Sequence, residues 1–104
     1  MNPDYWGAQT WHYLHSLSFT YPTKPTLRER LRFKRFFEHL LLPCNGCQQN
    51  YNQHLKDLPV SDFLKTKLDL AYWVYLIHST VNAMNKKPNP PFKEIKDKFM
   101  IKLS

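Results

Sequence analysis

The chain has 104 residues, which is enough for one hydrophobic core and leaves no room for a second. Fifteen Lys and Arg against eight Asp and Glu give a formal charge of +7, and three Trp, six Tyr and seven Phe supply large apolar side chains. The longest apolar run, residues 71–77, is too short to span a bilayer, and residues 1–4 do not begin a signal peptide. We expect a single soluble domain over residues 1–104.

The first half of the chain predicts helices, because apolar residues recur at helical spacing and do not alternate as in a strand. Asn2 and Pro3 are typical of a helix start, and the first helix is expected to run to about Tyr21. Residues 21–25 form a loop rich in Pro. Thr26 and Glu29 then predict a capping box that opens a second helix. Its expected core face consists of Phe33, Phe36, Phe37, Leu40 and Leu41.

The second half continues the pattern. Pro43 ends the second helix, and a third begins with the cysteine pair and continues towards Pro59. Ser61 and Asp62 predict the cap of a long fourth helix. The apolar residues assigned to that helix are Leu64, Leu68, Tyr72, Trp73, Tyr75, Leu76 and Val81. Residues 86–91 break it, and a short fifth helix follows, marked by Phe92, Ile95, Phe99 and Leu103. The prediction is an all-α fold, a four-helix bundle with a short fifth helix packed across it.

Cys44 and Cys47 are the two cysteines of the chain, in the sequence Cys44-Asn45-Gly46-Cys47. A zinc site normally needs a second pair of Cys or His ligands at a matching spacing. A disulfide that closes so short a loop constrains the unfolded chain very little. The pair therefore indicates redox chemistry. Its predicted position, at the first turn of the third helix, favours a thiolate through the helix dipole.

Two further groups of residues accompany the pair. The first helix carries Gly7-x-x-x-Trp11-x-x-x-His15, and the fourth carries Trp73-x-x-x-x-His78-x-x-Val81-Asn82, with Lys87-Pro88 shortly after. In order and in spacing, these groups resemble the FAD-dependent sulfhydryl oxidases of the Erv/ALR family, over roughly residues 6–88. Ser79, Asn50 and Asn85 stand where that family usually has Asn, His and Leu. The family's structural disulfide and shuttle cysteines are missing, which resembles the minimal forms encoded by large cytoplasmic DNA viruses.

The resemblance implies an enzyme that oxidises dithiols to disulfides. A dithiol or thioredoxin-like substrate protein would attack Cys44, and Cys47 would pass two electrons to FAD. Oxygen would then accept them as hydrogen peroxide. The cofactor-binding residues carried over from the family are Gly7, Trp11, His15, His78, Asn82 and Lys87. The resemblance also implies a homodimer, and the missing shuttle pair favours work in the host cell cytoplasm or the virion.

The residue types suit this chemistry, because aromatic rings can stack on flat rings, Asn both donates and accepts, and Lys attracts a pyrophosphate. Taken singly, Trp11, Trp73, His15 and His78 would more often be packed core residues. The alternative function is a non-catalytic helical interaction module whose cysteine pair is structural or binds metal.

Three other interpretations are disfavoured. A zinc site made by the cysteine pair with His39 and His54 matches no common ligand spacing, and we predict no metal. A thioredoxin-like fold would need alternating strands and helices. The basic second helix attracts polyanions, but a solvated surface explains it, so nucleic acid is not the expected partner, and neither is a membrane.

Overall fold

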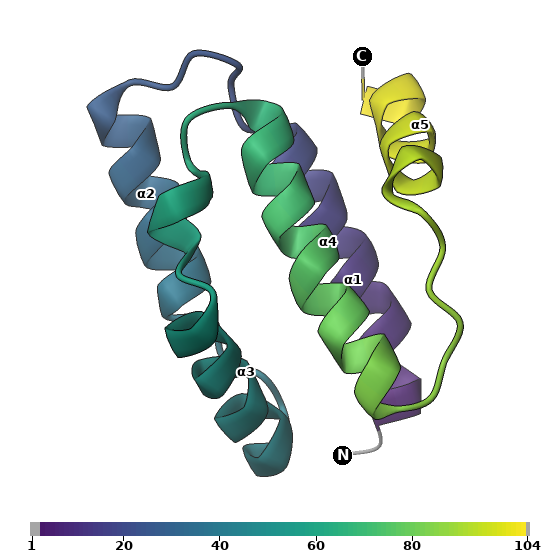
Figure 1. Ribbon diagram of the computed structural model, residues 1–104. Helices are drawn as coiled ribbons and strands as arrows, with labels where there is room; N and C mark the ends of the chain where they lie inside the picture. Colours follow the sequence, from purple (N-terminus) through teal and green to yellow (C-terminus); the bar gives the residue numbers. More distant parts are fainter. Residues whose placement is uncertain (1–2, 104) are drawn as a thin grey trace.

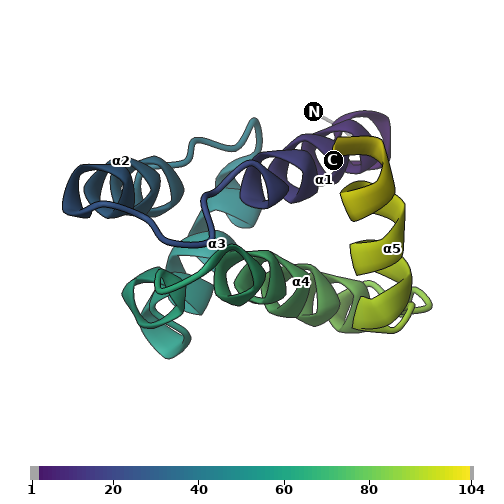
Figure 2. The ribbon, with the colours of Figure 1, turned by 90° about the horizontal axis from the view of Figure 1, so that it is seen from above.

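Two long helices that lie side by side, α1 (Pro3–Phe19) and α4 (Lys67–Met84), form the centre of the fold (Figures 1 and 2). The computed structural model describes residues 3–103, and the side chains of residues 5–100. The other helices in this part of the chain are α2 (Leu27–Glu38), α3 (Asn45–Asp57), the 3-10 turn η1 (Val60–Phe63) and α5 (Phe92–Leu103). The predictions of an all-α bundle, a short fifth helix and a cysteine pair at the start of the third helix are confirmed.

The main core joins the first four helices. Its buried side chains come from α1 to α4 and the connections between them: Leu14, Tyr21, Phe37, Tyr51, Val60, Leu64, Leu70, Trp73, Val74 and Ile77. A smaller cluster of Phe19, Ala71 and Phe99 fixes α5 against α1 and α4. In Figure 2, α5 spans the gap between the ends of these two helices. The fifth helix therefore closes one side of the bundle.

Buried polar groups of the aromatic residues are hydrogen-bonded to distant backbone. The Tyr21 hydroxyl donates to the carbonyl of Leu64 at 2.7 Å, and the Trp73 indole N–H donates to the carbonyl of Leu58 at 2.8 Å. Trp73 is 1% exposed. Such bonds offset the cost of burying a polar atom and fix the connection between α3 and α4. Trp73 is thus a core residue.

The capping box of α2 is confirmed, since Glu29 N–H donates to the Thr26 hydroxyl while Thr26 N–H donates to the Glu29 carboxylate. The expected end of α2 is wrong. The helix stops at Glu38, because the backbone of the next residues is bonded to the Gln48 side chain, which accepts from Leu42 N–H and donates to the carbonyl of Leu40. As a result Leu41 is 86% exposed and is no core residue.

The expected start of the fourth helix is also wrong. Ser61 and Asp62 lie in η1, and Leu64 lies between η1 and α4. The cap of α4 is Thr66, whose hydroxyl accepts from Asp69 N–H at 3.2 Å. The 3-10 turn η1 precedes α4 because Leu64, which follows it, is buried in the core. There the Leu64 carbonyl accepts a hydrogen bond from the Tyr21 hydroxyl.

Three smaller differences concern residues outside the core and helix ends. Leu68 and Tyr72, assigned to the core stripe of the fourth helix, are 42% and 41% exposed. The reason is that α4 carries apolar residues around more of its circumference than its neighbours cover. The first helix ends at Phe19, earlier than expected, and its predicted start at Asn2 lies outside the described residues.

None of the described helices is long and apolar enough to cross a membrane.

These caps can be tested directly. Thr66→Ala should lower the free energy of unfolding by about 1 kcal/mol, since it removes the acceptor of an N-terminal N–H of α4. In a domain of this size the melting temperature should fall by roughly 4–8 °C. Ser61→Ala is the control and should stay within about 0.5 kcal/mol of the parent protein. Urea unfolding followed by circular dichroism measures both, and a larger loss for Ser61→Ala would contradict the position of the cap.

Candidate active site

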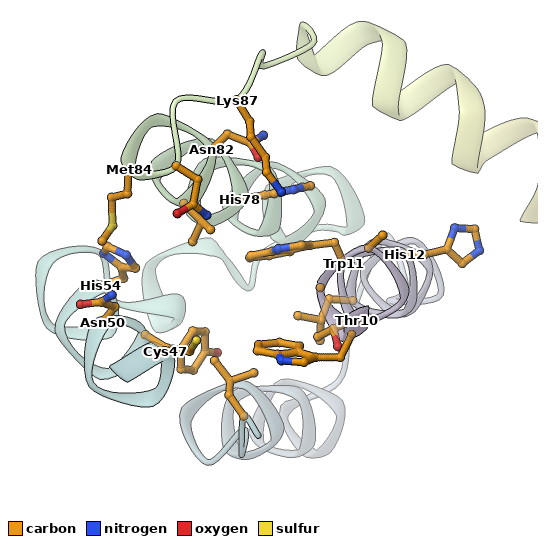
Figure 3. A pocket seen from close by; sticks show the side chains of 18 of the residues that line it. Thr10, Trp11, His12, Cys47, Asn50, His54, His78, Asn82, Met84 and Lys87 are labelled. Carbon is orange, nitrogen blue, oxygen red and sulfur yellow. The ribbon is translucent and has the colours of Figure 1, made fainter. Parts of the chain in front are cut away.

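A cavity of about 970 Å³ is lined by residues of α1, α3, α4 and α5. Figure 3 shows the side chains that α1, α3 and α4 contribute. Its walls include Trp6, Gly7 and Trp11 from α1, Cys47 and His54 from α3, His78 and Asn82 from α4, Lys87 from the following loop and Lys98 from α5. Of the eight residues predicted for the site, Gly7, Trp11, Cys47, His78, Asn82 and Lys87 line this one cavity. Segments far apart in the sequence therefore meet at one place.

One wall is a flat stack of rings. The rings of Trp11 and His78 lie 4.1 Å apart with an interplanar angle of 6°, and Figure 3 shows them parallel. His15 lies behind this stack, 3% exposed, with its Nε2 3.0 Å from Nδ1 of His78. On its other side its ring contacts Phe99 of α5 at 5.4 Å. His15 therefore orients His78, which in turn faces the cavity.

The two imidazoles are held in the neutral form. The pKa of His15 is lowered to about 4, mainly by burial and in addition by the neighbouring His78, Lys98 and His12. Burial likewise lowers the pKa of His78 to about 4, with a second contribution from the charge of Lys87. A neutral pair can share one proton between Nε2 and Nδ1, whereas two imidazolium rings at this distance would repel.

The cysteines form a disulfide at the N-terminus of α3, with their Cα atoms 5.2 Å apart. Cys44 is the N-cap residue, and its Sγ accepts from Cys47 N–H at 3.2 Å. Cys47 is the member of the pair that lines the cavity. The disulfide therefore has an inner sulfur, on Cys47, beside the space where a ligand would bind, and an N-cap sulfur, on Cys44.

A hydrogen-bonded clasp fixes the loop that carries Lys87. Asn89 accepts from the Asn82 side chain at 3.0 Å and donates to the hydroxyls of Ser79 at 2.9 Å and Tyr75 at 3.2 Å. In addition, Lys87 N–H donates to the carbonyl of Asn82 at 2.8 Å. We name these bonds the Asn89 clasp. It places Lys87 at the cavity and ties the loop to α4.

Sequence reasoning did not assign several of the lining residues to the site, among them Trp6, His54 and Lys98. Lys98 could not be expected, since the path of α5 is fixed by Phe99 packing against Phe19 and Ala71. Trp6 adjoins Gly7, and His54 follows Cys47 by seven residues on the same helical face, so a helical projection could have found both.

Polar atoms around the cavity lack partners. Trp6 Nε1, His15 Nδ1 and His54 Nε2 are buried and have no hydrogen-bond partner among the residues that the structure describes. Trp6 and His54 line the cavity, and His15 lies behind its wall. Buried polar atoms without partners are costly and rare in folded proteins, so the two in the cavity wall indicate a bound ligand or water. Within the described residues, no group of three or more His, Cys, Asp or Glu is arranged to hold a metal ion.

Comparison with known proteins identifies the class to which this fold and site belong. Residues 8–100 match the sequence model of the Erv1 / Alr family, and the chain belongs to this family. The chain is 36% identical over 90 residues to the probable FAD-linked sulfhydryl oxidase R368 of Acanthamoeba polyphaga mimivirus, covering 84% of this chain and 63% of that protein.

More distant relatives match in the same way. The chain is 28% identical to the mitochondrial FAD-linked sulfhydryl oxidase ERV1 of Saccharomyces cerevisiae, over 79% of this chain and 43% of that protein. It thus spans less than two thirds of the length of either of these relatives. The crystal structure of the FAD binding domain of Erv1 from Saccharomyces cerevisiae superposes with a TM-score of 0.89 at 23% identity, covering 95% of this chain and 94% of that one. This likeness establishes the shared fold.

The neutral histidine pair predicts how stability depends on pH. In the unfolded chain both imidazoles have an ordinary pKa near 6.5, whereas in the fold the pKa of each is about 4. Between these values the unfolded state binds more protons, so the free energy of unfolding should fall as pH drops from about 6.5 to about 4. Urea unfolding at several pH values measures this slope. His15→Gln should make it shallower, and the exposed His39→Gln should not. Equal slopes in all three proteins would contradict the assignment.

Proposed function

We propose that the chain is an FAD-linked thiol oxidase that forms disulfide bonds in substrate proteins. The observation that carries the proposal is a disulfide at a helix N-terminus whose Cys47 lines a cavity that has an aromatic wall and two cations. The overall reaction is 2 R–SH + O2 to R–S–S–R + H2O2. The names of the mimivirus and yeast relatives support the same activity.

The residues around the cavity fit FAD. The volume of about 970 Å³ is in the range of ligand pockets. The Trp11–His78 stack offers a flat surface to an aromatic ring system, and Lys87 and Lys98 supply positive charge for a pyrophosphate. Buried Trp6 Nε1 is a donor for which a ligand can provide the acceptor. Gly7 and Asn82 complete the proposed site, and His15 orients His78.

FAD, when bound, supplies a two-electron acceptor that oxygen can reoxidise with release of hydrogen peroxide. The chain's own chemistry is thiol–disulfide exchange. A substrate thiolate attacks Cys44 Sγ, forming a mixed disulfide and breaking the Cys44–Cys47 bond, so that Cys47 leaves as a thiolate. The second substrate thiolate then attacks the substrate sulfur of the mixed disulfide and releases Cys44 as a thiolate. The substrate is oxidised by two electrons, and the pair is reduced.

The N-terminus of α3 assists both leaving groups. Cys47 N–H already points at Cys44 Sγ, and a thiolate there accepts a stronger hydrogen bond than a neutral sulfur does. The positive end of the helix dipole acts on both sulfurs in the same sense. Because attack needs a substrate thiolate, turnover should rise with pH through the thiol range.

The remaining proposals concern partners and location. We propose a dithiol or thioredoxin-like substrate protein, oxygen as acceptor, and one sulfhydryl oxidase domain over residues 1–104. A homodimer is proposed with support from exposed apolar side chains on neighbouring helices, Tyr13 on α1 and Leu27 and Leu31 on α2. Work in a host cell cytoplasm or a virion is proposed from the similarity to mimivirus and iridescent virus proteins.

Flavin content separates this function from the alternative, a non-catalytic module. The purified chain should be yellow, should release about one FAD per chain on denaturation, and should consume oxygen with dithiothreitol. A colourless protein that neither takes up FAD nor consumes oxygen would exclude the oxidase.

His78→Ala should lower flavin occupancy, because it removes half of the Trp11–His78 stack. Helical content should stay close to that of the parent protein, since His78 is only half-buried in the cavity wall. Flavin absorbance per chain and far-ultraviolet circular dichroism measure the two effects. His39→Ala, on the exposed end of α2, is the matched control. Full flavin retention in both His15→Ala and His78→Ala would show that this wall does not hold the cofactor.

The two cysteines should differ in what they trap. Cys44→Ser and Cys47→Ser should both lose turnover with dithiothreitol, measured as oxygen uptake, because neither retains the disulfide. In Cys47→Ser the free Cys44 thiolate should attack a disulfide probe such as oxidised glutathione, forming a mixed disulfide with one half of the probe and releasing the other half as a thiolate. In Cys44→Ser the remaining Cys47 should react more slowly when FAD fills the cavity that it lines. Mass spectrometry measures both adducts. Near-normal turnover in either variant would remove the pair from the mechanism.

A further inference from the structure

His54 occupies a wall of the cavity that none of the three sequence motifs reaches. It follows Cys47 by seven residues in α3, which places both side chains on the same face of the helix, roughly 10 Å apart along its axis. Both residues line the cavity, and Figure 3 shows both on its α3 side together with Asn50. A ligand that touches Cys47 and extends along α3 therefore comes within reach of His54.

The His54 side chain has a buried nitrogen with nothing to bind. Its Nε2 has no hydrogen-bond partner within the described part of the chain. An imidazole nitrogen in this state destabilises the fold unless some other molecule pairs with it. The unpaired nitrogen is a property of this one side chain, because an apolar side chain at position 54 would carry no such polar atom.

Structural roles for the imidazole do not account for it. The end of α3 is completed by the main chain, where Leu58 N–H donates to the carbonyl of His54 at 2.8 Å. The side chain is not needed for that bond. Among the residues that the structure describes, His54 also belongs to no group of three or more potential metal ligands. What remains is the cavity that its ring faces.

We infer that His54 is a cofactor-binding residue, whose Nε2 hydrogen-bonds to a polar group of the bound flavin nucleotide at the part of the cavity remote from Cys47. This inference rests on the proposed function and deepens it. The imidazole can serve as donor or acceptor according to its tautomer, so it suits a carbonyl, a ring nitrogen or a ribityl hydroxyl. Binding would then remove the penalty that the flavin-free protein carries.

The test compares flavin affinity in two variants of the full chain. His54→Leu removes the nitrogen and keeps a similar volume, and we expect FAD to bind roughly three- to tenfold more weakly, the effect of one hydrogen bond. His54→Gln keeps a polar group at similar reach and should recover most of the affinity. Gln49→Leu makes the same kind of change on the exposed face of α3 and is the matched control. Titration of flavin-stripped protein with FAD, followed by flavin fluorescence, gives all four affinities.

A second measurement distinguishes binding from a merely structural role. Without flavin, His54→Leu should melt at the same temperature as the parent protein or higher, because it removes an unpaired buried nitrogen. Saturating FAD should raise the melting temperature of His54→Leu by less than it raises that of the parent protein. Equal flavin affinity in His54→Leu and the parent would overturn the inference while leaving the oxidase intact, and so would a loss of melting temperature that is the same with and without flavin. A parent protein that binds no FAD would instead overturn the proposed function, and this inference with it.

Discussion

The packing of α1 against α4 is the contact on which the cavity depends. The Trp11–His78 stack and the His15–His78 hydrogen bond both lie in this interface. Trp11 and His78 present a flat surface to the cavity, while His15 fixes the ring of His78 from behind. The stack keeps its geometry only while both imidazoles stay neutral, and their burial ensures this. A substitution that let water reach His15 would therefore favour its protonated form and disturb the Trp11–His78 stack, even if the substituted residue did not line the cavity.

The second constraint is the placement of a reactive disulfide at a helix start. A sulfur at the N-cap receives a backbone N–H that the helix itself leaves unused, so the same geometry that begins α3 also stabilises a thiolate on Cys44. Rotation by three residues then turns Cys47 towards the cavity. One helical turn thus separates the Cys44 sulfur at the helix cap from the Cys47 sulfur in the cavity wall. This separation alone gives the two cysteines different surroundings.

The sequence predicted what local spacing controls. Thr26 with Glu29, the cysteine pair and the two His motifs are short patterns, and the structure brings the motif residues to one cavity. It could not predict what distant contacts decide. The end of α2 depends on Gln48, the start of α4 on the burial of Leu64 beneath Tyr21, and the approach of Lys98 on Phe99 packing beside Phe19. In each case a contact outside the local pattern decided the result.

The departure at Ser79 shows how the site tolerates change. A hydroxyl at this position reaches less far than the amide usual in the family, yet it accepts from Asn89, which also binds Tyr75 and Asn82. The Asn89 clasp thereby connects a substituted motif position to the loop that carries Lys87. It also satisfies Asn82, which is 8% exposed and would otherwise bury an unpaired amide. On the α4 side of the cavity the Asn82 amide is thus paired within the protein. Trp6 on α1 and His54 on α3 still carry unpaired nitrogens, so a ligand has most to gain by hydrogen-bonding on those two sides.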